Sequence, residues 1–265
     1  TCPASTNGVV GFKPSVGIVS RTHVVPISST QDTAGPMTRT VYDTALLLSA
    51  IAGEDPADSA TVDVPRIADY TDGLDSFSLK GVRIGVMVNQ LGRREDLRAI
   101  FGQARADLEA AGAVLVDTEH EVNREMFRDS FTVLKFELRE EMGKYLRSIP
   151  EMQGVETPRS LADLIAFNEA NADTELRWFG QETFIEAEAE TDRETYEKAR
   201  ENAVRIAGEE TLDAILAENN VTFLIAPTRG PAWVSDLVNG DSFGGPVGFG
   251  SPAAIAGYPH LTVPM

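Results

Sequence analysis

A strand–helix–strand pattern between residues 82 and 116 constrains the fold of this chain more than any other feature. Residues 82–88, VRIGVMV, are a β-branched run of strand length. Residues 113–116 return as a second strand, and Gly112 stands just past the end of the helix between them. One apolar stripe defines that helix: Leu97, Ile100, Phe101, Ala104, Leu108 and Ala111. Such a unit favours an α/β fold, with helices on the faces of a parallel or mixed sheet.

Length and charge narrow the class of protein. The chain has 265 residues, enough for one large or two ordinary domains, and 42% of them are hydrophobic, enough for a substantial core. Its formal net charge of -18 argues against nucleic acid or an anionic membrane surface as a partner, because either would repel it. No apolar run reaches about 18 residues, so no membrane-spanning helix is expected.

Few residues are suited to disulfide or metal chemistry. Cys2 is the single cysteine, which excludes an internal disulfide but does not fix the cellular compartment. The histidines, at positions 23, 120 and 260, are too scattered to suggest a metal site. The acidic run EAEAETDRE at residues 186–194 lacks the ligand pattern and central glycine of a calcium loop, so it is interpreted as a solvated face or turn. We expect no metal site and no cofactor.

The first 41 residues carry the densest turn chemistry. They are rich in Gly, Pro, Ser and Thr, which favour turns and short strands over helix. The apolar run VVGFK at residues 9–13 stops at Pro14. Thr40 and Asp43 have the spacing of a capping box, and apolar residues recur at helical spacing after them. We predict short strands and turns, then a helix that begins at Val41 and ends at Gly53.

The same segment resembles the amidase signature family of serine amidohydrolases. The resemblance runs from Pro3 through GVVGFKPSVGIVSR, then VP-SS-QD-GPMTRTV-D-ALLL and AGEDPAD. It holds in register over about fifty residues and is therefore more specific than one short motif. It implies a single α/β/α domain with a large mixed, twisted central sheet covered by helices. It also implies cleavage of linear amides by a Ser, cis-Ser, Lys triad, in which the lysine acts as base through the middle serine.

The resemblance places the whole triad upstream of this chain. In the family the nucleophile precedes a Pro-Ala or Pro-Ser step, here Pro3-Ala4, and counting back puts it two positions before Thr1. The cis-serine and the lysine lie further upstream, so no catalytic residue is expected here, and Lys13 is interpreted as structural or solvated. Family chains also continue past the closing AGYPHLTVP stretch. We therefore expect one amidase-like domain over residues 1–265, truncated at both ends and inactive alone.

A helical middle region is predicted between residues 123 and 217. Residues 123–150 place an apolar stripe at helical spacing, which is either core or the wall of an acyl-binding channel: Met126, Phe127, Phe131, Leu134, Leu138, Met142 and Leu146. Residues 160–168, 176–188 and 194–217 complete the region. In the family, a WFGQE-like step such as residues 178–182 belongs to helices that flank the substrate entrance.

Three residues are candidates for roles near an active site. Asp32 either accepts hydrogen bonds that order the nucleophile region or caps its own turn. Trp233 and Asp241 are proposed to contact substrate, because loops after strands carry function and an aromatic beside an acid suits a peptide-like ligand. Core packing is the alternative for Trp233.

Three functions are considered. The first is an amidohydrolase that acts on a small-molecule or peptide amide and releases ammonia through a serine acyl-enzyme. Trp233, VNGD at residues 238–241 and SPAAIAGYPHLTVP most resemble the peptide amidase type within the family. The second is the glutaminase subunit of a tRNA-dependent amidotransferase, which needs a partner protein. The third is a non-catalytic remnant. A Ser/His/Asp hydrolase using Ser251 and His260 is disfavoured, because Ser251 lacks the G-x-S-x-G context.

Overall fold

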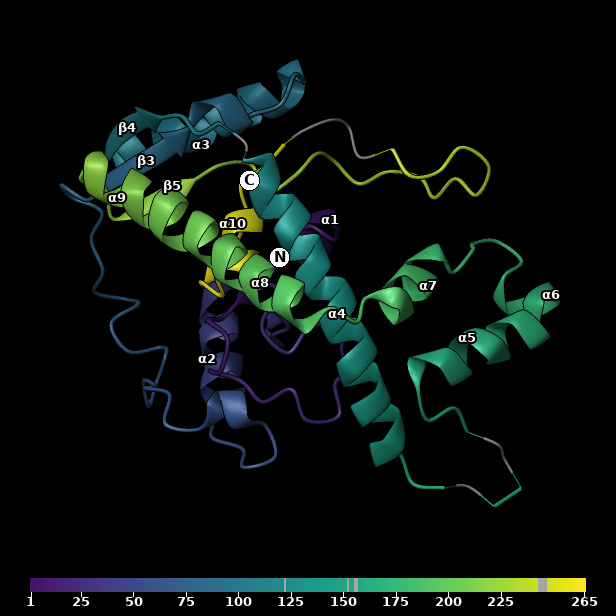
Figure 1. The fold of residues 1–265 in the computed structure, drawn as a ribbon. Helices are drawn as coiled ribbons and strands as arrows, with labels where there is room; N and C mark the ends of the chain where they lie inside the picture. The colour runs from purple at the N-terminus through teal and green to yellow at the C-terminus, as the bar shows by residue number, and fades with distance from the viewer. Residues whose placement is uncertain (122, 152, 155–156, 243–246) are drawn as a thin grey trace. The chain divides into compact units, whose positions relative to one another are not determined.

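The computed structural model describes residues 1–121, 123–151, 153–154, 157–242 and 247–265 (Figure 1). The chain divides into two compact units. Unit 1 comprises Thr1–Ser20, Thr33–Val122 and Ile206–Met265, and unit 2 comprises Arg21–Asp32 and Asn123–Arg205. The single domain expected from the sequence stays a prediction.

A three-stranded parallel sheet in unit 1 confirms the strand–helix–strand unit. Its order is β4-β3-β5, formed by β3 (Arg83–Met87), β4 (Val114–Thr118) and β5 (Phe223–Ile225). Ile84 pairs with Leu115 on one side and with Phe223 on the other. Helix α3 (Glu95–Ala110) connects β3 to β4. Ile84, Val86 and Met87 are buried, so β3 is the core of this sheet.

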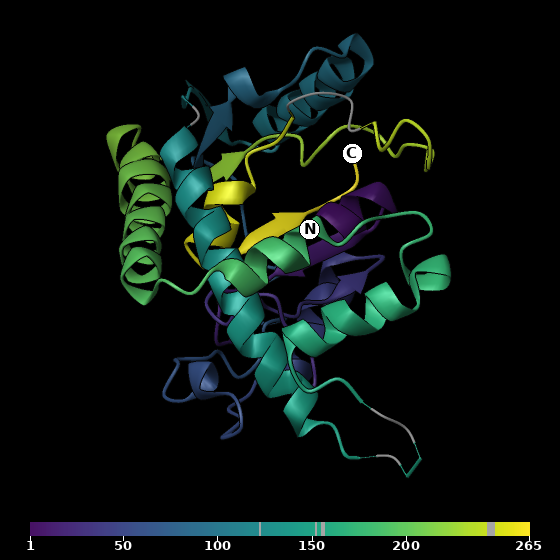
Figure 2. The ribbon, with the colours of Figure 1, turned by 45° about the vertical axis from the view of Figure 1, so that its right-hand side comes forward.

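A second, antiparallel sheet of unit 1 joins the two ends of the chain. Its order is β2-β1-β6, with β1 (Val10–Lys13) between β2 (Met37–Thr38) and β6 (His260–Thr262). Gly11 pairs with Thr262, and Lys13 pairs with His260. Figure 2 shows the yellow C-terminal strand beside the purple N-terminal segment. The predicted closing helix and strand are α10 (Ser251–Ile255) and β6.

The N-terminal helix α1 (Cys2–Thr6) departs from the expectation of turns and strands. Pro3 lies in the first turn, where its missing N–H leaves no helical bond unmade. The Thr6 hydroxyl donates to the Cys2 carbonyl over 2.8 Å, and the Asn7 side chain donates to the Pro3 carbonyl over 2.8 Å. These local bonds stabilise a helical turn that the composition alone did not indicate.

The helix predicted after Thr40 is α2 (Val41–Ile51). The Thr40 hydroxyl accepts a hydrogen bond from the Asp43 N–H at 3.0 Å and donates to the Asp43 carboxylate at 2.8 Å. The capping box predicted from the sequence is therefore confirmed. The helix ends at Ile51, two residues before Gly53. Shorter elements complete unit 1: η1 (Ser59–Thr61), η2 (Val88–Gln90), the π-helix η3 (Gly208–Asp213) and α9 (Ala214–Glu218).

Unit 2 is helical, as predicted. It contains α4 (Arg124–Ser148), α5 (Leu161–Ala170), α6 (Ala172–Glu175), α7 (Glu182–Ala189) and most of α8 (Arg193–Ala207). Figure 2 shows α4 as one long helix. It packs in one cluster with α5 and α7 and in another with α8. The two clusters comprise Leu138, Met142, Leu146, Leu161 and Ala187, and Val133, Phe136, Tyr196 and Ala199.

Two parts of the helical prediction differ from the structure. Phe127 and Phe131 are 42% and 46% exposed, because α4 buries Ser130, Val133 and Glu137 instead. The helix expected from residue 176 begins only at Glu182, after the poor helix former Gly180. Trp178 and Phe179 consequently lie outside the helix and are exposed.

Candidate functional site

The loop after β5 in unit 1 has a preformed turn at Asp236. One carboxylate oxygen of Asp236 accepts hydrogen bonds from the N–H groups of Val238 and Asn239, each at 2.9 Å. The other accepts from the Asn239 side-chain amide at 2.9 Å. These bonds, led by that from the Asn239 side chain, lower the pKa of Asp236 from its usual value. The turn is therefore organised by hydrogen bonds within the loop.

This loop lines a surface hollow of about 730 Å³. Trp233 and Asp241, both predicted from the sequence, line the same hollow together with Asn239. The Arg229 guanidinium lies 4.5 Å from the centre of the Trp233 ring, a cation–π geometry that orients the indole. The hollow thus offers an aromatic ring, a carboxylate and an amide.

Apolar side chains project from the same turn. Val234 and Val238 are 86% and 90% exposed. Exposed valines on an organised turn are available to contact the apolar part of a ligand. The sequence analysis gave neither valine a role of its own, although Val238 belongs to the VNGD stretch, because single valines in a loop carry no pattern.

Asp32 in unit 2 caps its own turn. Its Oδ2 accepts hydrogen bonds from the N–H groups of Ile27 and Ser28, both at 2.8 Å, and its own N–H donates to the Ser28 carbonyl at 2.9 Å. This is the geometry of one of the two roles considered for Asp32. The other role, ordering of the nucleophile region, stays a prediction.

Glu137 is a buried carboxylate that sequence reasoning missed. It is 2% exposed and lies in the middle of α4. Its oxygens accept hydrogen bonds from the Ser28 hydroxyl at 2.5 Å, the Thr30 hydroxyl at 3.0 Å and the Tyr196 hydroxyl at 2.7 Å. Burial, followed by this bond to Glu137, raises the pKa of Tyr196 to about 12. The only sequence signal was a glutamate between two apolar residues, Phe136 and Leu138.

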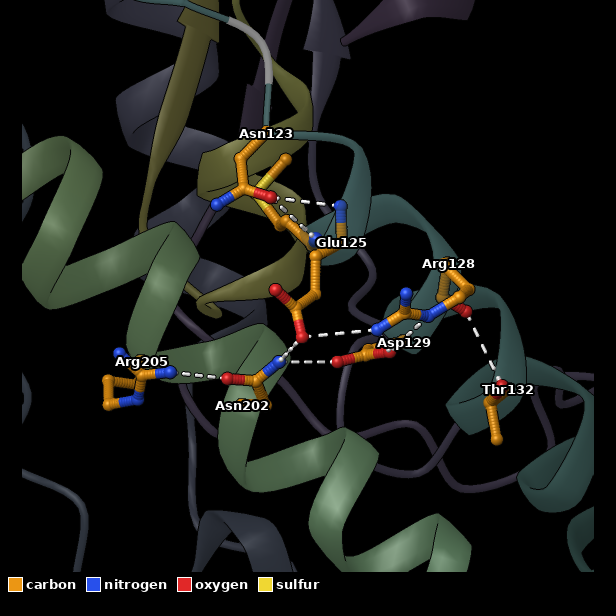
Figure 3. Close-up of polar contacts among 8 residues, drawn as sticks. Asn123, Glu125, Arg128, Asp129, Thr132, Asn202 and Arg205 are labelled. Carbon is orange, nitrogen blue, oxygen red and sulfur yellow. Dashed lines mark hydrogen bonds and ion pairs between the residues drawn. The ribbon is translucent and has the colours of Figure 1, made fainter.

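A second polar cluster of unit 2 joins the start of α4 to α8 (Figure 3). The Asn202 side-chain amide donates to Asp129 at 2.5 Å and to Glu125 at 3.2 Å. Arg128 forms an ion pair with each of these carboxylates. Asn123 caps the same helix by accepting from the Glu125 N–H at 2.9 Å. Every member has a partner within the cluster, which indicates a structural role.

Lys13 and His260 are neighbours across the β1–β6 pair. Burial lowers the pKa of His260 to about 4, and the nearby positive charge of Lys13 acts in the same direction. Burial alone lowers the pKa of Lys13 to about 8. The His260 Nδ1 lies 2.9 Å from the Thr1 hydroxyl. His260 is therefore neutral near pH 7 and holds Thr1 beside the last strand.

Among the described residues, no three His, Cys, Asp or Glu side chains come together as a metal-binding group. Of the helices in that part of the chain, none combines the length and apolar character needed to cross a membrane.

The sequence pattern of the family described as Amidase matches residues 1–265. The chain belongs to the amidase family. This amidase-family chain is 34% identical over 272 residues to a probable amidase of Arabidopsis thaliana, a match that covers 99% of the chain and 47% of the plant protein. A glutamyl-tRNA(Gln) amidotransferase subunit of Thermosynechococcus vestitus is 44% identical over 117 residues, which covers 43% of this chain and 24% of the relative.

Solved amidase-family structures share the fold. A peptide amidase in complex with the competitive inhibitor chymostatin superposes with a TM-score of 0.91 at 45% identity, over 100% of this chain and 54% of that one. The native peptide amidase from Stenotrophomonas maltophilia gives 0.87 at 44% identity, over 100% and 53%. The α/β fold expected from the sequence is confirmed. The chain spans about half the length of these relatives.

Proposed function

We propose that the protein carrying this chain hydrolyses linear amides, in particular C-terminal amides of peptides, to the acid and ammonia through a serine acyl-enzyme. The observation that carries the proposal is the superposition of the whole chain on a peptide amidase at 45% identity and a TM-score of 0.91. The resemblance places the Ser, cis-Ser, Lys triad outside these residues. This chain then supplies supporting structure and substrate contacts.

The hollow at Trp233 is the proposed substrate contact. An indole ring gives a flat apolar surface for a peptide side chain, and its Arg229 neighbour restrains its orientation. The Asp241 carboxylate accepts hydrogen bonds from peptide N–H groups or pairs with a cationic side chain. Contacts of this kind bind substrate and transition state alike, so their loss raises KM more than it lowers kcat.

A role within a tRNA-dependent amidotransferase is the second candidate. It is supported by the 44% identity to the glutamyl-tRNA(Gln) amidotransferase of Thermosynechococcus vestitus, although that match covers only 43% of this chain. Such a protein would release ammonia from glutamine and pass it to an acyl-tRNA held by a partner protein. Full coverage by peptide amidase favours the first candidate.

Ammonia release separates the two candidates. The protein is expressed from its complete coding sequence and is assayed with C-terminal peptide amides, simple aliphatic amides and glutamine. We expect the highest kcat/KM for peptide amides. Release from glutamine alone, increased by tRNA and a co-purifying protein, would establish the second candidate, and no release from any amide would refute both.

Trp233→Ala tests the contact within the same assay. We expect KM for a peptide amide to rise roughly tenfold with kcat changed less than about twofold. Phe77→Ala is the matched control, because Phe77 is an aromatic residue that is 62% exposed and does not line the hollow. Equal KM in the two variants would remove Trp233 from the substrate contact.

A further inference from the structure

The segment formed by residues 21–32 has an unusual place in the chain. Ser20 and Thr33, on either side of it, belong to unit 1, whereas the segment itself belongs to unit 2. It lies in the connection between β1 and β2, two paired strands of one sheet. The segment is therefore joined through the backbone to both strands.

Glu137 anchors this segment. Four groups donate to its two oxygens: the Ser28 hydroxyl at 2.5 Å, the Thr30 N–H at 3.1 Å, the Thr30 hydroxyl at 3.0 Å and the Tyr196 hydroxyl at 2.7 Å. Three of the four come from the segment, and the fourth comes from α8. Ser28 is fully buried and Glu137 is 2% exposed, so the bonds are shielded from water. One carboxylate thus joins the segment, α4 and α8.

Hydrogen bonds within the segment also hold Ser28, one of the residues that donate to Glu137. Asp32 accepts from the Ser28 N–H at 2.8 Å, while the Ser28 hydroxyl donates to Glu137. The same hydroxyl accepts from the Gln31 N–H at 3.2 Å. Ser28 is therefore held through its backbone and through its side chain, which leaves its position little freedom.

A buried carboxylate is a poor means of stabilising a core. Its desolvation costs several kcal/mol, and a well-packed apolar residue often stabilises as much or more. Directed hydrogen bonds instead specify position, because each loses strength steeply away from its preferred angle. The four bonds at Glu137 suit a residue that fixes where a segment lies.

We propose that Glu137 is a positioning residue: it holds residues 21–32 in one conformation and thereby sets the turnover of amide hydrolysis. The inference rests on the proposed function, which places the nucleophile two positions before Thr1. The backbone leads from the segment back to β1, and Ala4 of α1 packs against Gly11 of β1. A displacement of about 1 Å at a reacting group lowers a rate by up to about a hundredfold, so a loosened segment would act on kcat.

Glu137→Gln tests the anchor with little change in shape. The glutamine NH2 group would replace one of the two carboxylate oxygens. The hydroxyl or N–H groups that donate to that oxygen would then lose their acceptor. We expect hydrogen–deuterium exchange over residues 27–32 to become roughly tenfold faster, kcat for a peptide amide to fall at least about tenfold, and KM to change less than about twofold. Tyr196→Phe leaves the three bonds from the segment in place and should lower kcat less than about threefold.

Glu140→Gln is the matched control on the same helix. Glu140 pairs with Arg139, and its side chain is 39% exposed. Exchange over residues 27–32 and kcat should both match the unsubstituted protein. If Glu137→Gln does not fold, Thr30→Val replaces it, because valine keeps the shape of threonine and removes one donor to Glu137.

The possible outcomes test the role of Glu137 separately from the proposed amide hydrolysis. Unchanged exchange in Glu137→Gln would overturn the anchor, and faster exchange with unchanged kcat would leave Glu137 as a structural residue only. Absence of ammonia release from the unsubstituted protein would refute the proposed function and, with it, the link to turnover. Exchange would still decide whether Glu137 holds the segment.

Discussion

Asn202 of α8 donates its side-chain amide to Asp129 of α4 over 2.5 Å. Asp129 is 8% exposed, and its other oxygen receives the Arg128 guanidinium at 3.0 Å. The two helices are thus joined by a hydrogen bond to a nearly buried charge. Bonds to charged groups of this kind contribute more than neutral ones.

Asn202→Ala should lower the free energy of unfolding by about 1–3 kcal/mol, because Asp129 would stay buried and lose the hydrogen bond that it accepts from Asn202. Urea denaturation of the variant measures this change. Lys198→Ala, on the same helix, is the control: the Lys198–Glu194 pair is exposed and should change stability by less than about 0.5 kcal/mol. Equal effects of the two substitutions would contradict the role given to Asn202.

Gly11→Ala should destabilise the antiparallel sheet. An added Cβ would lie 2.3 Å from the Ala4 Cβ, so α1 or β1 must move. We expect a loss of about 1–3 kcal/mol, measured by thermal and urea unfolding.

Gly102→Ala, also in unit 1, should change stability in the opposite direction. Gly102 lies inside α3, and an added Cβ there meets no heavy atom within 4 Å. Alanine should therefore stabilise the helix by roughly 0.5–1 kcal/mol. If both glycine variants lowered the free energy of unfolding, the contact between β1 and α1 would not explain the loss of stability in Gly11→Ala.

His260 should make stability depend on pH in the acidic range. Its pKa in the folded chain is about 4, below the ordinary 6.5, so the unfolded chain binds more protons between these values. The free energy of unfolding therefore rises as pH increases from about 4 to 6.5 and falls on acidification, by up to about 3 kcal/mol. His260→Gln should flatten this dependence in urea titrations across that range.

Asp32→Ala decides between the two roles considered for Asp32. Loss of two backbone bonds should lower the free energy of unfolding by about 1–3 kcal/mol. If Asp32 also orders the nucleophile region, kcat/KM of the complete protein falls as well. Asp43→Ala is the control, because Asp43 belongs to the capping box of α2. A stability loss with unchanged kcat/KM in both variants would leave Asp32 as a turn cap.

Local patterns of the sequence predicted the local parts of the fold. The apolar stripe of residues 97–111 and its flanking strands predicted the parallel β3–β4 pair, because helical and strand periods are read within one segment. Thr40 and Asp43 predicted the start of α2 for the same reason. The helix over residues 123–150 was predicted, but the sequence did not fully predict which of its side chains are buried. The neighbouring helices decide which apolar side of the helix faces the core.

Contacts between distant residues were not predicted. Ser28, Thr30, Glu137 and Tyr196 meet at one point, yet no spacing relates them. Trp233 and Asp241 were selected for their chemistry, and the structure brings both to one hollow. Their contact with substrate stays a prediction.

The pairing of β1 with β6 has a consequence for biosynthesis. Lys13 leaves the ribosome well before its partner His260, because nearly the whole of this chain lies between them. At typical synthesis rates β1 waits for roughly ten seconds or more with one edge unpaired. An unpaired strand edge is a template for pairing with other chains. The antiparallel sheet therefore closes late, and the open edge of β1 is a site where chaperones can protect the chain during synthesis.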